Sequence, residues 1–259
     1  MRASRHNGRS GKHGVYDAKH NDRNFDVSNS EHIDAEKTRR NIYWDCYQGY
    51  CLGNSDSRRK LTFSEVEKIY YLKQYGDHVE EQNKRNEKGG HAERNRTIED
   101  VLKNSKTCPE ESLLQLGNMD YSVSPETLVK VVAEFFEEFQ KRYGSHVHIL
   151  DWALHLDEAT PHVHVRQVYD ALNQYGELCP MQDKALEELG FYLPDPSKKK
   201  GRYNNRKMTF DAECRKLFLE IAGKMESCWN ANLSMVVQAI WRSRTILLKN
   251  KRIRLWSNR

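Results

Sequence analysis

The stretch HVHILDWALHLDEATPHVHVRQV, residues 146–168, decides the fold, because it places two runs of β-forming residues on either side of a short polar turn. Valine, isoleucine and aromatic residues are enriched in strands. The connection LDEATP, residues 156–161, is six residues long and contains a proline. A connection of this length folds the second strand back beside the first. We therefore expect an antiparallel β-hairpin here.

The best predicted helix precedes this hairpin, in SPETLVKVVAEFFEEFQKRYG, residues 124–144. Ser124 suits the N-cap, Pro125 the first helical position and Gly144 the end of the helix. Strands near residues 42–47 and 112–117, and helices from Ser64 to the glycine pair at 89–90 and over residues 209–224, complete the pattern. This order predicts an α+β fold: an antiparallel β-sheet with flanking helices, which we expect on one side of the sheet.

The composition is that of a very polar protein, with 37% hydrophobic residues, 31% charged residues and a mean hydropathy of −0.90. The sequence has no run of 18 apolar residues and no apolar segment of a secretory signal near its start, so we expect no membrane span and a cytoplasmic (bacterial) location. Its six cysteines form no CxxC pair, which argues against a cysteine zinc site.

Positive charge is concentrated in three segments, although the net charge is only +5. Residues 1–14 read as a flexible basic arm, residues 15–225 as one domain, and residues 226–259 as a basic, atypical tail. The tail has no acidic residue from 227 onward. It is either an appendage that touches DNA or membrane, or a non-native ending produced by a change of reading frame, which we favour.

The third basic segment is PSKKKGRYNNRK, residues 196–207, in which a tyrosine lies among the cations. Such a cluster suits a phosphate backbone, and an aromatic ring suits a stacked base. A solvated loop is the alternative interpretation. The basic residues that we assign to DNA binding are Lys198, Lys199, Lys200, Arg202, Arg206 and Lys207.

Five of the eleven histidines lie in the hairpin segment, and the word HVH occurs there twice. Side chains alternate faces along a strand, so a regular strand points the first HVH, at 146–148, away from His155. The hairpin instead brings His155, His162 and His164 to one place. Three imidazoles leave a coordination position open, as in a catalytic metal site. Nearby carboxylates favour harder ions, so we expect a divalent metal, most simply Mn²⁺ or Mg²⁺.

A second duplication lies near the start of the chain, where the word HNxR occurs at residues 6–9 and again at residues 20–23. The first copy lies in the Gly- and Ser-rich arm, whereas His20 leads into a segment of mixed acidic, basic and aromatic residues. We therefore expect the second copy to be the functional one.

HLDEATPHVH, residues 155–164, resembles the signature of the Pre/Mob plasmid recombination and mobilisation relaxases, the MobV group of HUH endonucleases, where HUH corresponds to His162, Val163 and His164. The segment KHNDRNFDVSNSEHIDAEKTRRNIYWD is similar to the first motif of that family. The two motifs come in the family's order. The resemblance covers about residues 14–224. Proteins of this family generally continue into a longer C-terminal region that could supply a homodimer contact, and this chain does not show one.

The resemblance implies a function and a set of roles. The protein would nick and rejoin one DNA strand at a plasmid origin of transfer, presented single-stranded or as a hairpin, through a covalent 5′-phospho-histidine intermediate. His20 would be the nucleophile and Arg23 would contact a phosphate, while Glu158, with Asp157, would tune the metal held by the three histidines or orient them. Asn21 and Asn41, which we place in the DNA-binding set, would position His20 or the ligands, unless they act only in local turns.

Two alternatives remain open. A rolling-circle replication initiator also uses an HUH metal site but presents a catalytic tyrosine after it, for which Tyr169 and Tyr175 are the candidates in position. The second alternative is a DNA-binding protein that holds a metal and has no nuclease activity. The formation of a covalent protein–DNA adduct separates the relaxase from this last alternative.

Overall fold

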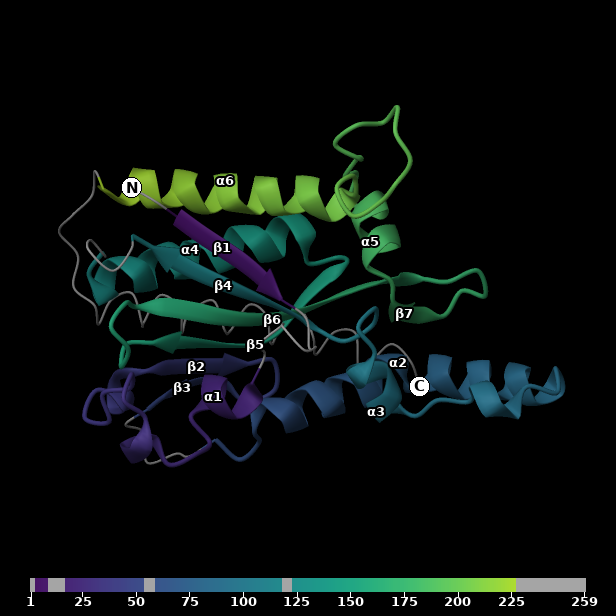
Figure 1. Cartoon of the computed structure of the whole chain (residues 1–259), viewed down its shortest axis with the longest axis horizontal. Helices are drawn as coiled ribbons and strands as arrows, with labels where there is room; N and C mark the ends of the chain where they lie inside the picture. The colour runs from purple at the N-terminus through teal and green to yellow at the C-terminus, as the bar shows by residue number, and fades with distance from the viewer. Residues whose placement is uncertain (1–2, 9–16, 54–58, 118–122, 227–259) are drawn as a thin grey trace, which may run out of the picture.

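The structure is a computed structural model that describes residues 3–8, 17–53, 59–117 and 123–226 (Figure 1). The strands are β1 (Ala3–Gly8), β2 (Ile42–Asp45), β3 (Gly49–Leu52), β4 (Glu110–Leu116), β5 (Val147–His155), β6 (His162–Leu172) and β7 (Leu178–Pro180). The α-helices are α1 (Ala18–Asp22), α2 (Phe63–Lys88), α3 (Ile98–Lys103), α4 (Pro125–Tyr143), α5 (Gln182–Glu188) and α6 (Arg206–Glu226). Short 3-10 turns are η1 (Val27–Asn29), η2 (Thr38–Arg40) and η3 (Ala92–Arg94).

The strands form one antiparallel sheet in the order β1-β4-β6-β5-β2-β3, and β7 pairs with the end of β6. The predicted hairpin lies in the middle of this sheet. Strands β5 and β6 pair antiparallel, with His155 directly opposite His162. The α+β class with an antiparallel sheet and flanking helices is confirmed.

The helices cover both faces of the sheet, so the expectation that they lie on one side is wrong. Helices α4 and α6 pack on the face that carries Trp152 and Val163. Helices α2 and α3 pack on the opposite face, where tyrosines of α2 contact Leu150 and Val168. Figure 1 shows α6 above the sheet and α2 below it in that view. The sequence did not predict this second layer of helices, because α2 buries tyrosines rather than a stripe of aliphatic residues.

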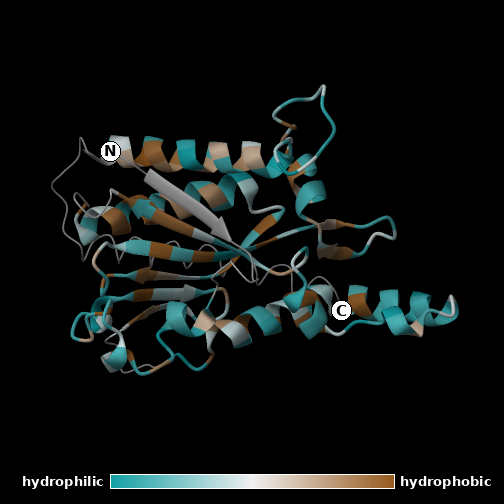
Figure 2. Cartoon of the chain, viewed as in Figure 1, coloured by the Kyte–Doolittle hydropathy of each residue, from teal (hydrophilic) through white to brown (hydrophobic). Residues whose placement is uncertain are grey.

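Helix α4 has the predicted ends. The Ser124 side chain accepts a hydrogen bond from the Thr127 amide, Pro125 occupies the first turn, and Gly144 ends the helix. Its apolar face is buried in the larger core, where Phe139 contacts rings of α4 itself and of α6. In Figure 2 the hydrophobic residues gather on the central strands and on α4, while the distal half of α2 is mostly hydrophilic.

The structure gives the N-terminal arm a different form from the one expected. Ala3–Gly8, which includes His6, is a strand that pairs antiparallel with β4 along the edge of the sheet. Glycine and serine there do not prevent pairing, because an open sheet edge offers backbone partners to any extended segment. The C-terminal tail, with both interpretations of its origin, lies outside the described residues.

An irregularity in β5 changes the argument from alternating faces. The pairing shifts between Ile149 and Asp151, which is the signature of a β-bulge at Leu150. The extra residue reverses the alternation, so His148, opposite Val168, lies on the same face as His155. His148 is nevertheless absent from the histidine cluster, because its pairing position is six residues farther along β6, about 20 Å at the rise of a strand. The first HVH segment is therefore kept away from the second by its distance along the sheet, and not by the face on which its side chains lie.

Within the described ranges, no helix is long and apolar enough to cross a membrane.

Candidate functional site

Three histidines of the hairpin meet at the turn end of β5 and β6. All three are buried, with exposed fractions of 0% for His155, 8% for His162 and 9% for His164. The ring centroids are 4.9–5.3 Å apart. The strand register causes this proximity, because His155 and His162 are directly opposite and His164 follows on the same face.

Each of the three rings has one nitrogen held by a hydrogen-bond acceptor. His155 Nε2 lies 2.9 Å from the carbonyl of Asn21, His162 Nδ1 lies 2.8 Å from the carbonyl of Thr160, and His164 Nδ1 lies 2.9 Å from Oε1 of Glu111. Carbonyl and carboxylate oxygens can only accept, so each of these nitrogens donates. In the neutral rings, the other nitrogen of each histidine therefore carries a lone pair.

These lone pairs are available to a metal ion, and one ligand atom from each of His155, Glu158 and His162 lies within 4.8 Å of the other two. His155 Nδ1 is buried and makes no hydrogen bond among the described residues. His162 Nε2 and His164 Nε2 are 3.1 Å apart, so two neutral rings in these tautomers oppose their lone pairs. A shared cation removes that repulsion. Acceptors that fix the outer nitrogens of metal-binding histidines are the usual support of such a centre.

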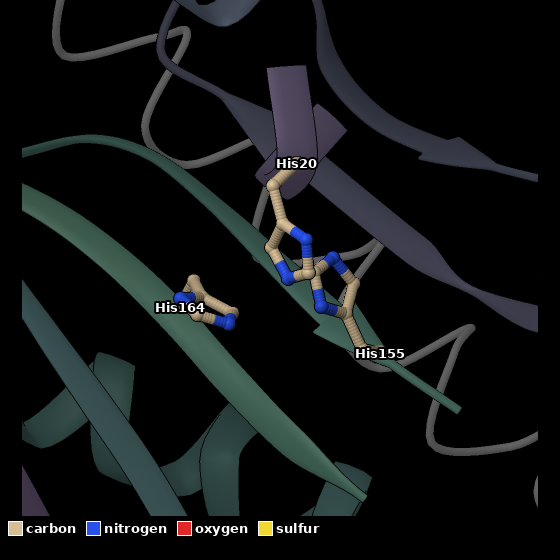
Figure 3. Close-up of side chains that lie close together, drawn as sticks. All are labelled: His20, His155 and His164. Atoms are coloured by element: carbon tan, nitrogen blue, oxygen red, sulfur yellow. The ribbon is translucent and has the colours of Figure 1, made fainter. Parts of the chain in front are cut away.

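His20 joins these rings from a different part of the chain. Asp17 is the N-cap of helix α1 and its side chain accepts a hydrogen bond from the Lys19 amide, while Arg23 is the C-cap. Figure 3 shows His20 reaching from α1 toward His155 and His164. One nitrogen of each of these three rings lies within 4.8 Å of the other two. The structure thus brings together His20 and the predicted ligands, although more than 130 residues separate them in the chain.

Arg23 has a different environment from the one expected. Its side chain is only 3% exposed, and its guanidinium donates to both carboxylate oxygens of Asp157 at 2.8 and 3.0 Å and to Glu158 at 2.7 Å. It therefore holds two carboxylates of the site rather than facing an outside phosphate. The residue types did not distinguish these roles, because phosphate and carboxylate both accept the forked donors of arginine.

Asn21 and Asn41, which we expected in the DNA-binding set, are buried, with exposed fractions of 2% and 0%. Asn41 donates to Asp157 at 2.7 Å and accepts from the Leu156 amide at 2.8 Å, which fixes the hairpin turn. Asn21 donates to Glu111 at 2.8 Å. Both agree with the narrower expectation that they position the site.

Glu158 is the acidic group that lies close to three of these rings. Its Oε1 lies 3.3 Å from His20 Nε2 and 3.5 Å from His155 Nδ1, and its Oε2 lies 3.8 Å from His162 Nε2. Burial alone raises the pKa of this carboxyl, but its contacts with His155, His20 and Arg23 outweigh burial and hold the pKa well below the usual value. Glu158 is therefore an anion in the centre of the cluster.

Sequence reasoning missed two residues. Glu111 on β4 orients His164, and it lies opposite Arg166 in the neighbouring strand. The available signal was an acidic residue next to a predicted strand of apolar residues. His32, in the loop after η1, stacks on the His20 ring with centroids 5.9 Å apart. No pattern in the sequence marked it.

The basic segment lies elsewhere in the structure. It forms the loop between α5 and α6, at the opposite end of the molecule from α1 in Figure 1. Lys198 and Lys200 form surface ion pairs with Asp195 and Asp183. Two members of the predicted set are half-buried and paired inside the domain: Arg206 with Asp183 and Glu187, and Lys207 with Glu110 and Asp211. These ion pairs leave Lys199 and Arg202 as the exposed cations for which the described residues provide no ionic partner.

Comparison with known families gives one match. The model of the Mob_Pre family, described as plasmid recombination enzyme, matches residues 118–189. The matched range contains the whole β5–β6 hairpin and the three histidines. A comparison with curated proteins found no match.

Solved structures that resemble the chain are of a protein described with the same family name. Three crystal structures of the MobM relaxase domain (MOBV; Mob_Pre), Mn-bound and bound to plasmid pMV158 oriT DNA, align with it. The first has a TM-score of 0.41 and 17% identity over 69% of this chain and 74% of that one. The second has a TM-score of 0.36 and 20% identity over 62% of this chain and 65% of that one. The third has a TM-score of 0.34 and 19% identity over 58% of this chain and 61% of that one.

The burial of His155 in the β5–β6 hairpin predicts a pH dependence of stability. Burial, with the nearby Arg23 charge, lowers the pKa of His155 to about 4. An unfolded histidine titrates near pH 6.5, so between about pH 4 and 6.5 the unfolded chain binds more protons and stability falls as the pH falls. With chelator present, we expect His155→Gln to remove about 2–3 kcal/mol of the loss between pH 7 and 4.5. Urea unfolding at several pH values measures this, and parallel curves for the two proteins would contradict it.

Proposed function

We propose that this protein is a relaxase: a metal-dependent enzyme that nicks and rejoins one DNA strand at a plasmid origin, in mobilisation or site-specific recombination. One observation carries the proposal. His20, an accessible imidazole, lies within 4.8 Å of His155 and His164, whose buried rings are held in the tautomers that a metal requires. A nucleophile next to a metal that binds phosphate is the arrangement that phosphoryl transfer needs.

Residues His155, His162 and His164 would hold the divalent ion, with Glu158 beside them. Three imidazoles and a carboxylate suit Mn²⁺, and Mg²⁺ is the alternative. When bound, the ion neutralises charge on the non-bridging oxygens of the scissile phosphate.

His20 would attack the phosphorus. A neutral imidazole nitrogen has a lone pair near pH 7 without a strong base. The step forms an N–P bond and breaks the bond from phosphorus to the 3′ oxygen, which takes a proton from water. The products are a 5′-phospho-histidine adduct and a 3′-hydroxyl. Attack of that hydroxyl on the adduct reverses the step and rejoins the strand.

Arg23 and Glu158 would set the position of His20. His20 Nε2 lies 3.3 Å from a guanidinium nitrogen of Arg23, which can only donate, and 3.3 Å from Glu158 Oε1, which accepts. The first contact suits the tautomer with a lone pair on Nε2, and the second suits a protonated ring. The same two residues can therefore hold the ring both as the neutral nucleophile and as a cation.

The substrate would be single-stranded or hairpin DNA of the origin, and the α5–α6 loop supplies a second contact surface for it. Asn204 is buried, and its side chain donates to the carbonyls of Asp195, Lys198 and Lys199. The hydrogen bonds of this buried side-chain amide hold the loop in place. The Tyr203 ring, 77% exposed, projects from it with a guanidinium 5.3 Å from the ring centroid. An exposed ring among cations can stack on a base.

A replication initiator with a tyrosine nucleophile has less support. Tyr169 is 3% exposed and faces the α4–α6 core, away from the histidines. Tyr175 lies in the turn after β6, at the far end of the strand from His162, where it stacks with Arg85.

The nucleophile assignment predicts a loss of the covalent adduct. We expect His20→Ala to lower adduct formation with a single-stranded origin oligonucleotide and Mn²⁺ by at least about 10³-fold, because the substitution removes the nitrogen that would attack phosphorus. Denaturing gels measure the adduct, and mass spectrometry identifies the modified residue.

His6→Ala is the matched control, since it changes the other HNxR word, and it should keep the adduct. An adduct of undiminished yield in His20→Ala would contradict the assignment. A wild-type protein that binds the oligonucleotide but forms no adduct would favour the DNA-binding alternative.

The metal assignment predicts graded losses of affinity. We expect His164→Ala to abolish Mn²⁺ binding measured by calorimetry and Glu111→Ala to weaken it about 10–100-fold, because the freed ring loses the acceptor that sets its tautomer. His148→Ala, which changes a histidine at the other end of the same face, is the control. An unchanged isotherm for His164→Ala would refute the assignment.

The loop predicts a change in salt dependence. For the double variant Lys199→Ala and Arg202→Ala, we expect weaker binding to single-stranded DNA and a slope of log affinity against log salt that is smaller by about 1.4. Fluorescence anisotropy at several salt concentrations measures both quantities. Lys216→Ala, on the exposed side of α6, should leave them unchanged, and an equal slope in the double variant would show that the loop does not contact phosphate.

A further inference from the structure

His20 takes part in a second group of potential metal ligands, and one member of it, His32, has no role in the proposed chemistry. One ligand atom from each of His20, His32 and Glu158 lies within 4.8 Å of the other two. This group contains neither His162 nor His164. It lies on the solvent side of the cluster, because His20 and Glu158 have side chains 28% and 18% exposed and His32 is exposed.

The loop holds His32 in this position although the side chain is exposed. Ile33, the residue that follows His32, is 7% exposed and anchors the loop in the protein. The Asp34 amide donates to the carbonyl of Asp157 at 2.7 Å. The His32 ring lies nearly parallel to the His20 ring, with an interplanar angle of 18°. The backbone on one side of His32 is thus tied to the same hairpin turn that carries Glu158.

We propose that His20, His32 and Glu158 form a second, inhibitory site for a borderline divalent cation such as Zn²⁺. Two imidazoles and one carboxylate form a known zinc ligand set, and binding of first-row metals by such donors is weakest for Mn²⁺. The Glu158 carboxylate is the acidic member of this group. The site can therefore select Zn²⁺ in the presence of the ion that supports the reaction.

Occupation of this site blocks the nucleophile. A neutral imidazole has one lone pair in its ring plane, and a nitrogen that donates it to a metal cannot attack phosphorus. The inference rests on the proposed function only in this inhibitory consequence, because the ligand set itself is independent of the reaction. The enzyme would thus be inactive in excess Zn²⁺ and active when Zn²⁺ is scarce.

The first test counts bound Zn²⁺ by competition with a chromophoric chelator, using the full chain. We expect two equivalents for the wild type, one for His32→Ala and one for His164→Ala. His91→Ala, which removes another exposed histidine at the start of η3, should keep two. His32→Ala that retains both equivalents would overturn the inference.

The second test measures nicking with Mn²⁺ as Zn²⁺ is added, each variant being compared with its own rate without Zn²⁺. The concentration that halves the rate should rise at least about 10-fold in His32→Ala and stay unchanged in His91→Ala. Equal inhibition of wild type and His32→Ala would overturn the inhibitory role. If the wild type forms no adduct while His32→Ala still loses one equivalent of Zn²⁺, the proposed function fails and the site stands.

Discussion

Asp157 is the buried carboxylate on which the arrangement of the site depends. It is 1% exposed and accepts hydrogen bonds from the side chains of Arg23, Thr38 and Asn41, while its carbonyl accepts from the Asp34 amide. A buried carboxylate without such partners costs several kcal/mol. The N-terminal segment must therefore dock on the β5–β6 turn to satisfy it, and this docking brings α1 to the histidines.

The same docking divides the charges among the groups of the site. Arg23 has the positive-φ conformation at the end of α1, with φ of 54°, the one such non-glycine residue in the described ranges. This conformation costs on the order of 1 kcal/mol, which the paired contacts with Asp157 and Glu158 offset. Burial, with the nearby Arg23 charge, lowers the pKa of His155, while contacts with the rings and Arg23 hold Glu158 ionised. The result is a neutral His155 beside a fixed anion.

The sequence was sufficient for the hairpin, because its strand pattern and turn length set which residues face each other. His155 opposite His162 follows from that register. The sequence did not predict the role of a residue where that role depends on burial and not on residue type. The bulge at Leu150 is one example, since no residue there marks an inserted position. Glu111 is another, because its contact with His164 depends on how β4 pairs with β6, a long-range choice that local pattern does not encode.

Charge balance connects the metal to the substrate. Three carboxylates, Glu111, Asp157 and Glu158, have pKa values held below their usual range and are ionised, whereas Arg23 contributes one positive charge near them. These four groups therefore carry a net negative charge, and the buried histidines add none when they are neutral. Such a site repels a phosphate in the absence of a cation. Under the proposed function, a divalent ion is needed to admit the scissile phosphate as well as to stabilise its reaction.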